Sequence, residues 1–313
     1  MEKGEPNLIS KLFLPSCILI CTTLLQSQTG IPVAGFPYSK PGNTIAAAPG
    51  QVIMVSVFGI ATRFPAPVSP LPTSTGLPTQ VQSISVDFNQ GTLTIPLPIR
   101  VIQQTPCPAT GICTPATSIT TQIPYELLTN SAVPASLKVK EGGIIVADIV
   151  IKPLTDSVHV INSCDQTGIF LSLAYDVPAD VCAPMVMHLR GPLVSAAAPA
   201  RPGELLIMWA YGLGAIDRPL LPNCCATGED RPLAIQPFSV TVSYADQGRF
   251  PWRRLSQQEP GYAGMDGAGL YQIHFTVPPA PADLGSCTAK SGNLKVHLNG
   301  PSSSDNAEIC LQP

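Results

Sequence analysis

The chain has 313 residues, of which 12% are charged, and a formal net charge of −3 at pH 7. This charged share is about half the usual value and both signs are scattered, which excludes the basic stripe that a nucleic-acid partner needs. The apolar share of 45% excludes a disordered chain, and the length allows two domains.

The first 29 residues have the pattern of a secretory signal peptide. Lys3 and Lys11 give a positive start. Leu12 to Leu25 is largely apolar but shorter than the roughly 20 residues of a membrane-spanning helix. We therefore expect residues 1–29 to be removed and the chain to be secreted or held at the bacterial cell surface. The alternative is an uncleaved leader that serves as a membrane anchor.

Short β-branched runs separated by turn residues follow the leader. Pro96 and Pro98 interrupt the run from Leu93 to Gln103, which predicts an edge strand. Ile144 to Ile151 is nearly continuous in apolar residues, which predicts a strand with core on both faces. Further strands are predicted at 51–58, 81–88, 118–124, 136–139, 204–211, 238–244, 270–277, 293–298 and 307–311. This spacing is typical of β-sandwiches.

Several landmarks occur twice, at offsets of 153, 154 and 157 residues. Pro49-Gly50-Gln51 recurs as Pro202-Gly203-Glu204, Ile119 to Pro124 as Ile273 to Pro278, and Leu137-Lys138-Val139 as Leu294-Lys295-Val296. A nearly constant offset indicates a tandem duplication. We expect an all-β fold with one β-sandwich domain at 30–158, and a linker with a second β-sandwich domain at 159–313.

The ordered set of these motifs resembles a paralogous domain family of exported proteins in Solibacter and other acidobacteria. Ala48-Pro49-Gly50-Gln51 with Gly59, followed by Gln122 to Leu127, is similar to the first half of that domain. Pro199 to Glu204, followed by Tyr211-Gly212-Leu213-Gly214, is similar to the second half. The resemblance implies paired immunoglobulin-like domains in an exported protein, and it supplies neither a molecular role nor catalytic residues. The cysteines of this chain depart from the family pattern.

Eight cysteines remain after the leader, and an even number behind an export signal predicts disulfides. They are Cys107, Cys113, Cys164, Cys182, Cys224, Cys225, Cys287 and Cys310. There is no Cys-x-x-Cys pair and the histidines are dispersed, so we expect neither a metal site nor a cofactor.

Two expectations concern how the cysteines pair. We expect Cys107 to pair with Cys113, because the two are close enough in sequence to close a small loop that contains Pro108 and Gly111. The adjacent Cys224 and Cys225 should not pair with each other, and we expect them to reach towards the remaining cysteines.

Several residues that resemble phosphate-binding or catalytic motifs have simpler interpretations. Tyr211-Gly212-Leu213-Gly214 lacks the following helix of a phosphate-binding loop, which favours a turn at a strand end. His274 and His297 are expected on solvent-exposed strand faces. Asp217 and Glu229-Asp230 are acids of one loop, so a glycan hydrolase with loop-borne acids is the alternative function.

The most unusual cluster is Phe250-Pro251-Trp252-Arg253-Arg254, with Tyr262 close behind it. Aromatic and guanidinium groups suit recognition of a sugar face or a charged partner. The simpler alternative is a strand whose tryptophan packs on the core. We expect a non-enzymatic module for binding, adhesion or spacing at the cell surface. Its partner would be a glycan or a surface protein, without nucleic acid, and with a membrane only through an uncleaved leader.

Overall fold

The computed structural model describes residues 32–35, 42–71, 76–105, 114–130, 132–165, 182–218, 232–246, 249–258, 262–267, 269–288 and 291–313. For 33–35, 246, 249–258 and 262–267 it describes the backbone alone. The fold is all-β, with four sheets and no helix among these residues, as the sequence predicts. None of the described residues therefore forms a helix long and apolar enough to span a membrane.

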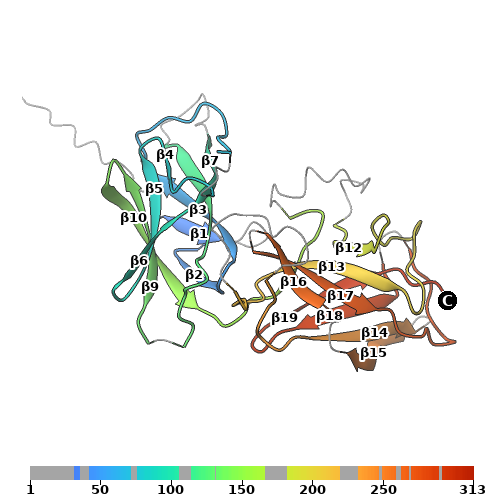
Figure 1. Ribbon diagram of the computed structural model, residues 1–313. Helices are drawn as coiled ribbons and strands as arrows, with labels where there is room; N and C mark the ends of the chain where they lie inside the picture. Colours follow the sequence, from blue (N-terminus) through green and yellow to red (C-terminus); the bar gives the residue numbers. More distant parts are fainter. Residues whose placement is uncertain are drawn as a thin grey trace, which may run out of the picture.

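Residues 33–153 form the first two sheets, called here the N-terminal sheet pair (Figure 1). One sheet pairs β1 (Val33–Gly35), β3 (Val52–Phe58), β8 (Ala116–Gln122) and β7 (Ile99–Thr105) in that order. The other pairs β2 (Thr44–Ala47), β10 (Ile144–Pro153), β9 (Ala135–Glu141), β5 (Ile84–Gln90) and β4 (Gln80–Val81), with β6 (Leu93–Leu97) also on β5. Alternate residues of both sheets face one core, which is the arrangement of a β-sandwich.

Residues 159–309 form the C-terminal sheet pair, drawn from yellow to red in Figure 1. One sheet pairs β11 (His159–Val160), β13 (Leu205–Tyr211), β17 (Leu270–Thr276) and β16 (Tyr262–Gly267), with β12 (Val186–His188) also on β13. The other pairs β15 (Arg249–Gln258), β14 (Ser239–Asp246), β18 (Leu294–Asn299) and β19 (Ser304–Ile309). Its core is separate from the first, and the change from one core to the next falls between Ile151 and Val158. The predicted domain boundaries themselves stay predictions.

The chain passes from one sheet of the N-terminal pair to the other at Pro98, two residues after Pro96. β6 ends at Leu97 on the edge of one sheet, and β7 begins at Ile99 on the edge of the other. Pro98 stands between them, where it interrupts no strand ladder. The single edge strand predicted over Leu93 to Gln103 is therefore two edge strands, one in each sheet of the pair.

The prediction for Ile144 to Ile151 is wrong. In β10 only Ala147, Ile149 and Ile151 are buried, and their neighbours are exposed. Ile144 remains 73% exposed and Val150 50% exposed. A nearly continuous apolar run thus forms a half-buried strand whose outer side is mostly apolar.

The repeated Pro-Gly landmarks adopt the same local geometry. Gly50 and Gly203 have φ of 77° and 78°. The Gly50 N–H donates to the Ile123 carbonyl at 3.0 Å, and the Gly203 N–H donates to the Val277 carbonyl at 2.8 Å. Both turns thus have the left-handed conformation that favours glycine. The tandem duplication stays a prediction that this likeness supports.

Candidate functional site

The predicted recognition cluster is divided between two sheets. Phe250, Trp252, Arg253 and Arg254 lie in β15, at the edge of one sheet, whereas Tyr262 begins β16, at the edge of the other. The strand register places Arg254 opposite Ser243 and Arg253 opposite Tyr244. Tyr262 stands opposite His274. The side chains of the cluster lie outside the described residues.

β15 carries features that protect an edge strand from pairing with another chain. Its register with β14 shifts twice, between Val242 and Ser243 and between Tyr244 and Asp246. Pro251 and the two arginines lie in the same strand. Bulges, proline and charge are common means of blocking edge-to-edge association. Phe250 to Arg254 therefore stand at a strand edge that is unsuited to strand addition.

The junction between the two sheet pairs is built from the repeated landmarks. The Gln51 side chain is fully buried, and its Nε2 donates to the Ser157 carbonyl at 3.1 Å. The Ser157 N–H in turn donates to the Gly212 carbonyl at 2.8 Å. Gly212 has φ of 78°, and a Cβ there would lie 1.8 Å from the Ser157 oxygen. Glycine at this position is what allows the connecting segment to lie against the end of β13.

A second contact joins the N-terminal pair to the turn before β17. A Cβ on Gly269 would lie 2.0 Å from the Gly50 carbonyl oxygen. Gln122 Nε2 donates to that same oxygen at 2.9 Å and to the Tyr125 hydroxyl at 3.1 Å. Burial raises the pKa of Tyr125, so its hydroxyl keeps its proton, and it accepts a hydrogen bond from the Gly269 N–H. The junction is thus a network of buried hydrogen bonds closed by two glycines.

Tyr211-Gly212-Leu213-Gly214 is a turn at a strand end, as predicted. A Cβ on Gly214 would lie 2.2 Å from the Thr155 carbonyl oxygen, so segment 155–157 fills the space beside both glycines. The Tyr271 hydroxyl donates to the Gly214 carbonyl at 2.8 Å. A phosphate has no room in this turn, which serves the junction.

A cluster that sequence reasoning missed surrounds His159. Its Nε2 lies 2.9 Å from Asp165 Oδ2 and its Nδ1 lies 3.0 Å from Asp305 Oδ2. Burial lowers the pKa of His159, but the hydrogen bonds and charges of the two aspartates outweigh burial and raise it. Burial likewise raises the pKa of Asp305, and hydrogen bonds from His159 and the Val160 N–H reverse this and lower it.

The His159 cluster is expected to make stability depend on pH. Because the folded-state pKa of His159 lies above 6.5, its contribution is present below pH 6.5 and is lost as pH rises through the folded value. The Asp305 contribution is present above pH 3.8 and is lost as pH falls through its lowered folded pKa. Between pH 3.8 and pH 6.5, His159 and Asp305 therefore both make their full contribution to stability. His159→Gln should lower the free energy of unfolding by about 1–2 kcal/mol in that window.

The measurement is thermal unfolding of both proteins at pH 5.5 and pH 9. The stability difference between wild type and His159→Gln should shrink at the higher pH. A difference of equal size at both values would contradict the ionic role of His159.

The other histidines also make local contacts. His188 Nδ1 contacts Glu204 Oε1, and its Nε2 contacts the Ala198 carbonyl at 3.1 Å. His274 and His297 are half-buried, so the expectation that they are solvent-exposed is wrong. His297 Nε2 lies 3.3 Å from Ser243 Oγ, and His274 Nε2 lies 3.4 Å from Gln272 Oε1.

The acids of the alternative hydrolase are only partly described. Asp217 accepts a hydrogen bond from the Leu233 N–H at 2.8 Å and lies 3.4 Å from Arg218 Nη2. Its slight burial raises its pKa, but these hydrogen bonds and the arginine charge lower it overall. A general acid in glycan hydrolysis needs a raised pKa. Glu229 and Asp230 lie outside the described residues.

Two disulfides confirm the disulfide prediction for half of the eight cysteines. Cys164 pairs with Cys182 and Cys287 with Cys310, with Cα atoms 5.0 and 5.4 Å apart. Because these four pair among themselves, the expected bonds from Cys224 and Cys225 to them are wrong. Cys224 and Cys225 lie outside the described residues, as do Cys107 and Cys113.

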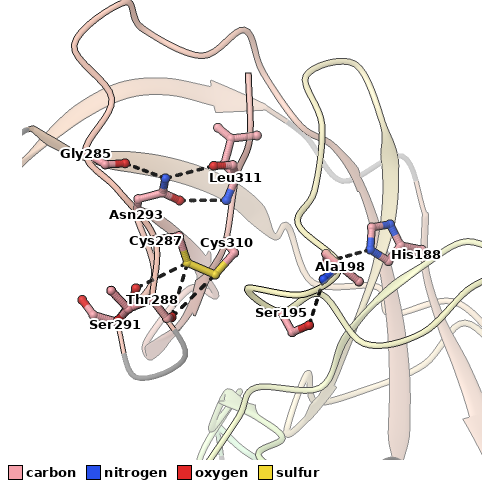
Figure 2. The surroundings of a disulfide bond; sticks show 10 residues. All are labelled: His188, Ser195, Ala198, Gly285, Cys287, Thr288, Ser291, Asn293, Cys310 and Leu311. Atoms are coloured by element: carbon pink, nitrogen blue, oxygen red, sulfur yellow. Dashed lines mark hydrogen bonds between the residues drawn. A yellow bond between two sulfur atoms is a disulfide. The ribbon is translucent and has the colours of Figure 1, made fainter.

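The second disulfide lies beside a buried amide that fixes the end of the chain (Figure 2). Asn293 Nδ2 donates to the Gly285 carbonyl at 2.7 Å and to the Leu311 carbonyl at 2.9 Å. Asn293 Oδ1 accepts from the Leu311 N–H at 2.7 Å. The segment after β19 is thus held to the loop before β18 by a disulfide and an amide.

Asp156 is a further buried group that the sequence did not single out. Its fully buried carboxylate accepts hydrogen bonds from the N–H and hydroxyl groups of Ser302 and Ser303, at 2.5 to 2.9 Å. It therefore ties the segment between the sheet pairs to the turn between β18 and β19. An aspartate in a connecting segment is expected to be solvated, and no local sequence pattern predicts that Asp156 is buried.

No family model matches the chain, and no curated protein matches it. Among the described residues, no group of three histidine, cysteine or acidic side chains is placed to hold a metal ion. The resemblance to the acidobacterial family stays a prediction.

Proposed function

We propose that this chain is an exported, non-enzymatic module that holds two immunoglobulin-like β-sandwiches in a fixed arrangement and binds a partner at the cell surface. The single observation that supports this most is the junction. There the Pro-Gly-Gln landmark at 49–51 meets Ser157, the Gly-x-Gly landmark at 212–214 and Gly269. The most distinctive sequence motifs thus serve the relative placement of two units, as a spacer or a presenting scaffold requires.

The disulfides support the compartment of this proposal. Stable disulfides are typical of oxidising environments outside the cytosol. Both described bonds tie irregular segments to a sandwich: one links Cys164 and Cys182, and the other links Cys287 to Cys310 after β19. Cross-links of this kind suit a protein exposed to proteases and dilution outside the cell.

The place we propose for binding is the two edge strands β15 and β16, one in each sheet of the C-terminal pair. In the N-terminal pair, β6 and β7 hold the corresponding positions before β8, as β15 and β16 do before β17. Of these four strands, only β15 holds a tryptophan and two adjacent arginines. The C-terminal pair therefore differs from the N-terminal pair at the two edge strands between which the chain passes from one sheet to the other. We propose a glycan or a surface protein as the ligand.

Trp252→Ala tests this proposal. Truncating an aromatic hot spot costs about 2 kcal/mol or more, so affinity for a glycan or protein ligand found by screening should fall roughly thirtyfold. The melting temperature should stay close to that of wild type. Leu128→Ala is the matched control, because Leu128 is 54% exposed in the N-terminal part of the chain.

Three outcomes would oppose the proposal. A melting temperature lowered by many degrees would make Trp252 a core residue. Unchanged binding and stability would favour a passive spacer. Release of reducing ends from glycans by the wild-type chain, abolished by Asp217→Asn, would establish the hydrolase instead.

A further inference from the structure

One sheet edge in the N-terminal pair is left without a partner strand. β10 pairs with β9 along its length, but β2 covers only Val150 to Pro153 of its other edge. In the described structure, residues 144–149 make no backbone pairing on that side. Figure 1 shows β10 at the side of the N-terminal pair that faces away from the C-terminal sheets. Their backbone groups on that side therefore point into solvent.

The side chains along this edge are apolar and exposed. Ile144 is 73%, Ile145 50% and Val146 38% exposed. The hairpin turn beside them is Gly142-Gly143, and a Cβ on either glycine would meet no atom within 4 Å. The space beside both glycines is thus open, although the Gly142 N–H donates to the Ser83 carbonyl at 2.8 Å, and the apolar residues that follow are exposed.

This edge contrasts with the long edge strands of the C-terminal pair. β15 contains Pro251, two arginines and two register shifts. β19 carries Asp305 and Glu308. From 144 to 149, β10 has no proline, a single charge at Asp148 and one bulge at Val146. The segment thus keeps one bulge and one charge but lacks the proline, the adjacent arginines and the second register shift of β15, and edges with less protection pair more readily with another strand.

We propose that residues 144–149 of β10 are a strand-addition site whose occupant is the same segment of a second copy of this chain. Two identical strands that meet antiparallel across a two-fold axis satisfy each other's backbone groups and extend one continuous sheet. Asp148 stands opposite Lys138 of β9, so each copy brings its own neutralising charge to the contact. The exposed isoleucines and valine become shared between the copies. This inference is independent of the proposed ligand site on β15 and β16.

A second copy fits better than a lipid surface as the occupant. The unpaired backbone N–H and C=O groups of a strand edge need hydrogen-bond partners, which hydrocarbon cannot supply. Lys140 is held by Asp87 at 2.5 Å, and Glu141 accepts hydrogen bonds from the Ala61 and Thr62 N–H groups. The hairpin tip therefore has no cluster of positive charge directed at anionic lipid.

The test is the mass of the mature chain in solution, measured by light scattering and sedimentation across the micromolar range. Wild type should rise from the mass of one chain towards that of two as concentration increases. Val146→Lys places a charge at the middle of the edge and should remain at the mass of one chain at every concentration. Ile144→Lys, next to Glu141 in the ladder, should weaken the association in the same way.

Leu128→Lys is the control, because it adds the same charge at an exposed apolar residue outside this edge, and it should associate as wild type does. Hydrogen exchange locates the contact: those backbone amides of 144–149 that do not donate to β9 should exchange fast in dilute protein and become protected on association. The proposal is overturned by a wild type that keeps the mass of one chain, by a Val146→Lys dimer, or by protection of these amides in the dilute monomer.

Discussion

Gly269→Ala is expected to disrupt the junction between the two sheet pairs. The new Cβ would lie 2.0 Å from the Gly50 carbonyl oxygen, and this contact is with backbone, which cannot turn aside as a side chain would. Alanine would also be held at φ of 79°, in the left-handed region. Left-handed strain and overpacking together should lower the free energy of unfolding by about 2–4 kcal/mol.

Gly203→Ala is the matched control for this change. Gly203 has φ of 78°, but a Cβ there would meet no atom within 4 Å. Gly203→Ala should therefore lower the free energy of unfolding only by the cost of the left-handed conformation, about 1 kcal/mol. Denaturant unfolding compares the two variants, and small-angle scattering reports whether Gly269→Ala increases the radius of gyration. Equal losses of stability in both variants would show that Gly269 and Gly50 do not make the close contact.

Asp156→Ala is expected to be the second severe substitution. It removes the acceptor of the Ser302 and Ser303 N–H and hydroxyl groups from a fully buried position. Buried donors left without a partner, and the loss of hydrogen bonds to a charged group, should lower stability by about 3–5 kcal/mol.

The comparison for Asp156 is Asp148→Ala, which removes an exposed carboxylate and should change stability by less than about 0.5 kcal/mol. Chemical denaturation measures both. If Asp156→Ala is as mild as Asp148→Ala, the connecting segment is not held by this carboxylate.

The strand positions could be predicted from the sequence because each depends on a local pattern. Alternation in the second half places Leu294, Val296 and Leu298 in the core, and the turn at Asn299-Gly300 follows from its dipeptide. The all-β class follows from many such short segments, without any knowledge of their pairing.

The failures have a common physical cause, which is that burial depends on partners distant in sequence. The apolar run of β10 reads as doubly buried, yet no element covers its outer side among the described residues. Asp156 reads as a loop acid, yet it is buried by a turn 146 residues later. The pairing of Cys287 with Cys310 follows from the path of β18 and β19 between them, which spacing alone does not reveal.

The junction joins one end of the N-terminal pair to a different kind of end of the C-terminal pair. Each pair also has an outer end, away from the junction, and the residues there show whether the same contact could form again. By register and backbone hydrogen bonding, the outer end of the C-terminal pair corresponds to the junction end of the N-terminal pair. At that outer end Glu204 stands where the junction has Gln51, and Pro279 stands where it has Tyr125. A carboxylate and an imino ring supply neither the amide donor nor the hydroxyl.

The outer end of the N-terminal pair is altered as well. Gly59 occupies the position that corresponds to Gly212, but Pro115 occupies the position of Gly269. A contact between unlike ends extends into an open chain of units wherever both surfaces recur. Neither surface recurs among the described residues, so neither outer end carries the set of residues with which this junction is built, and the same contact would not form there.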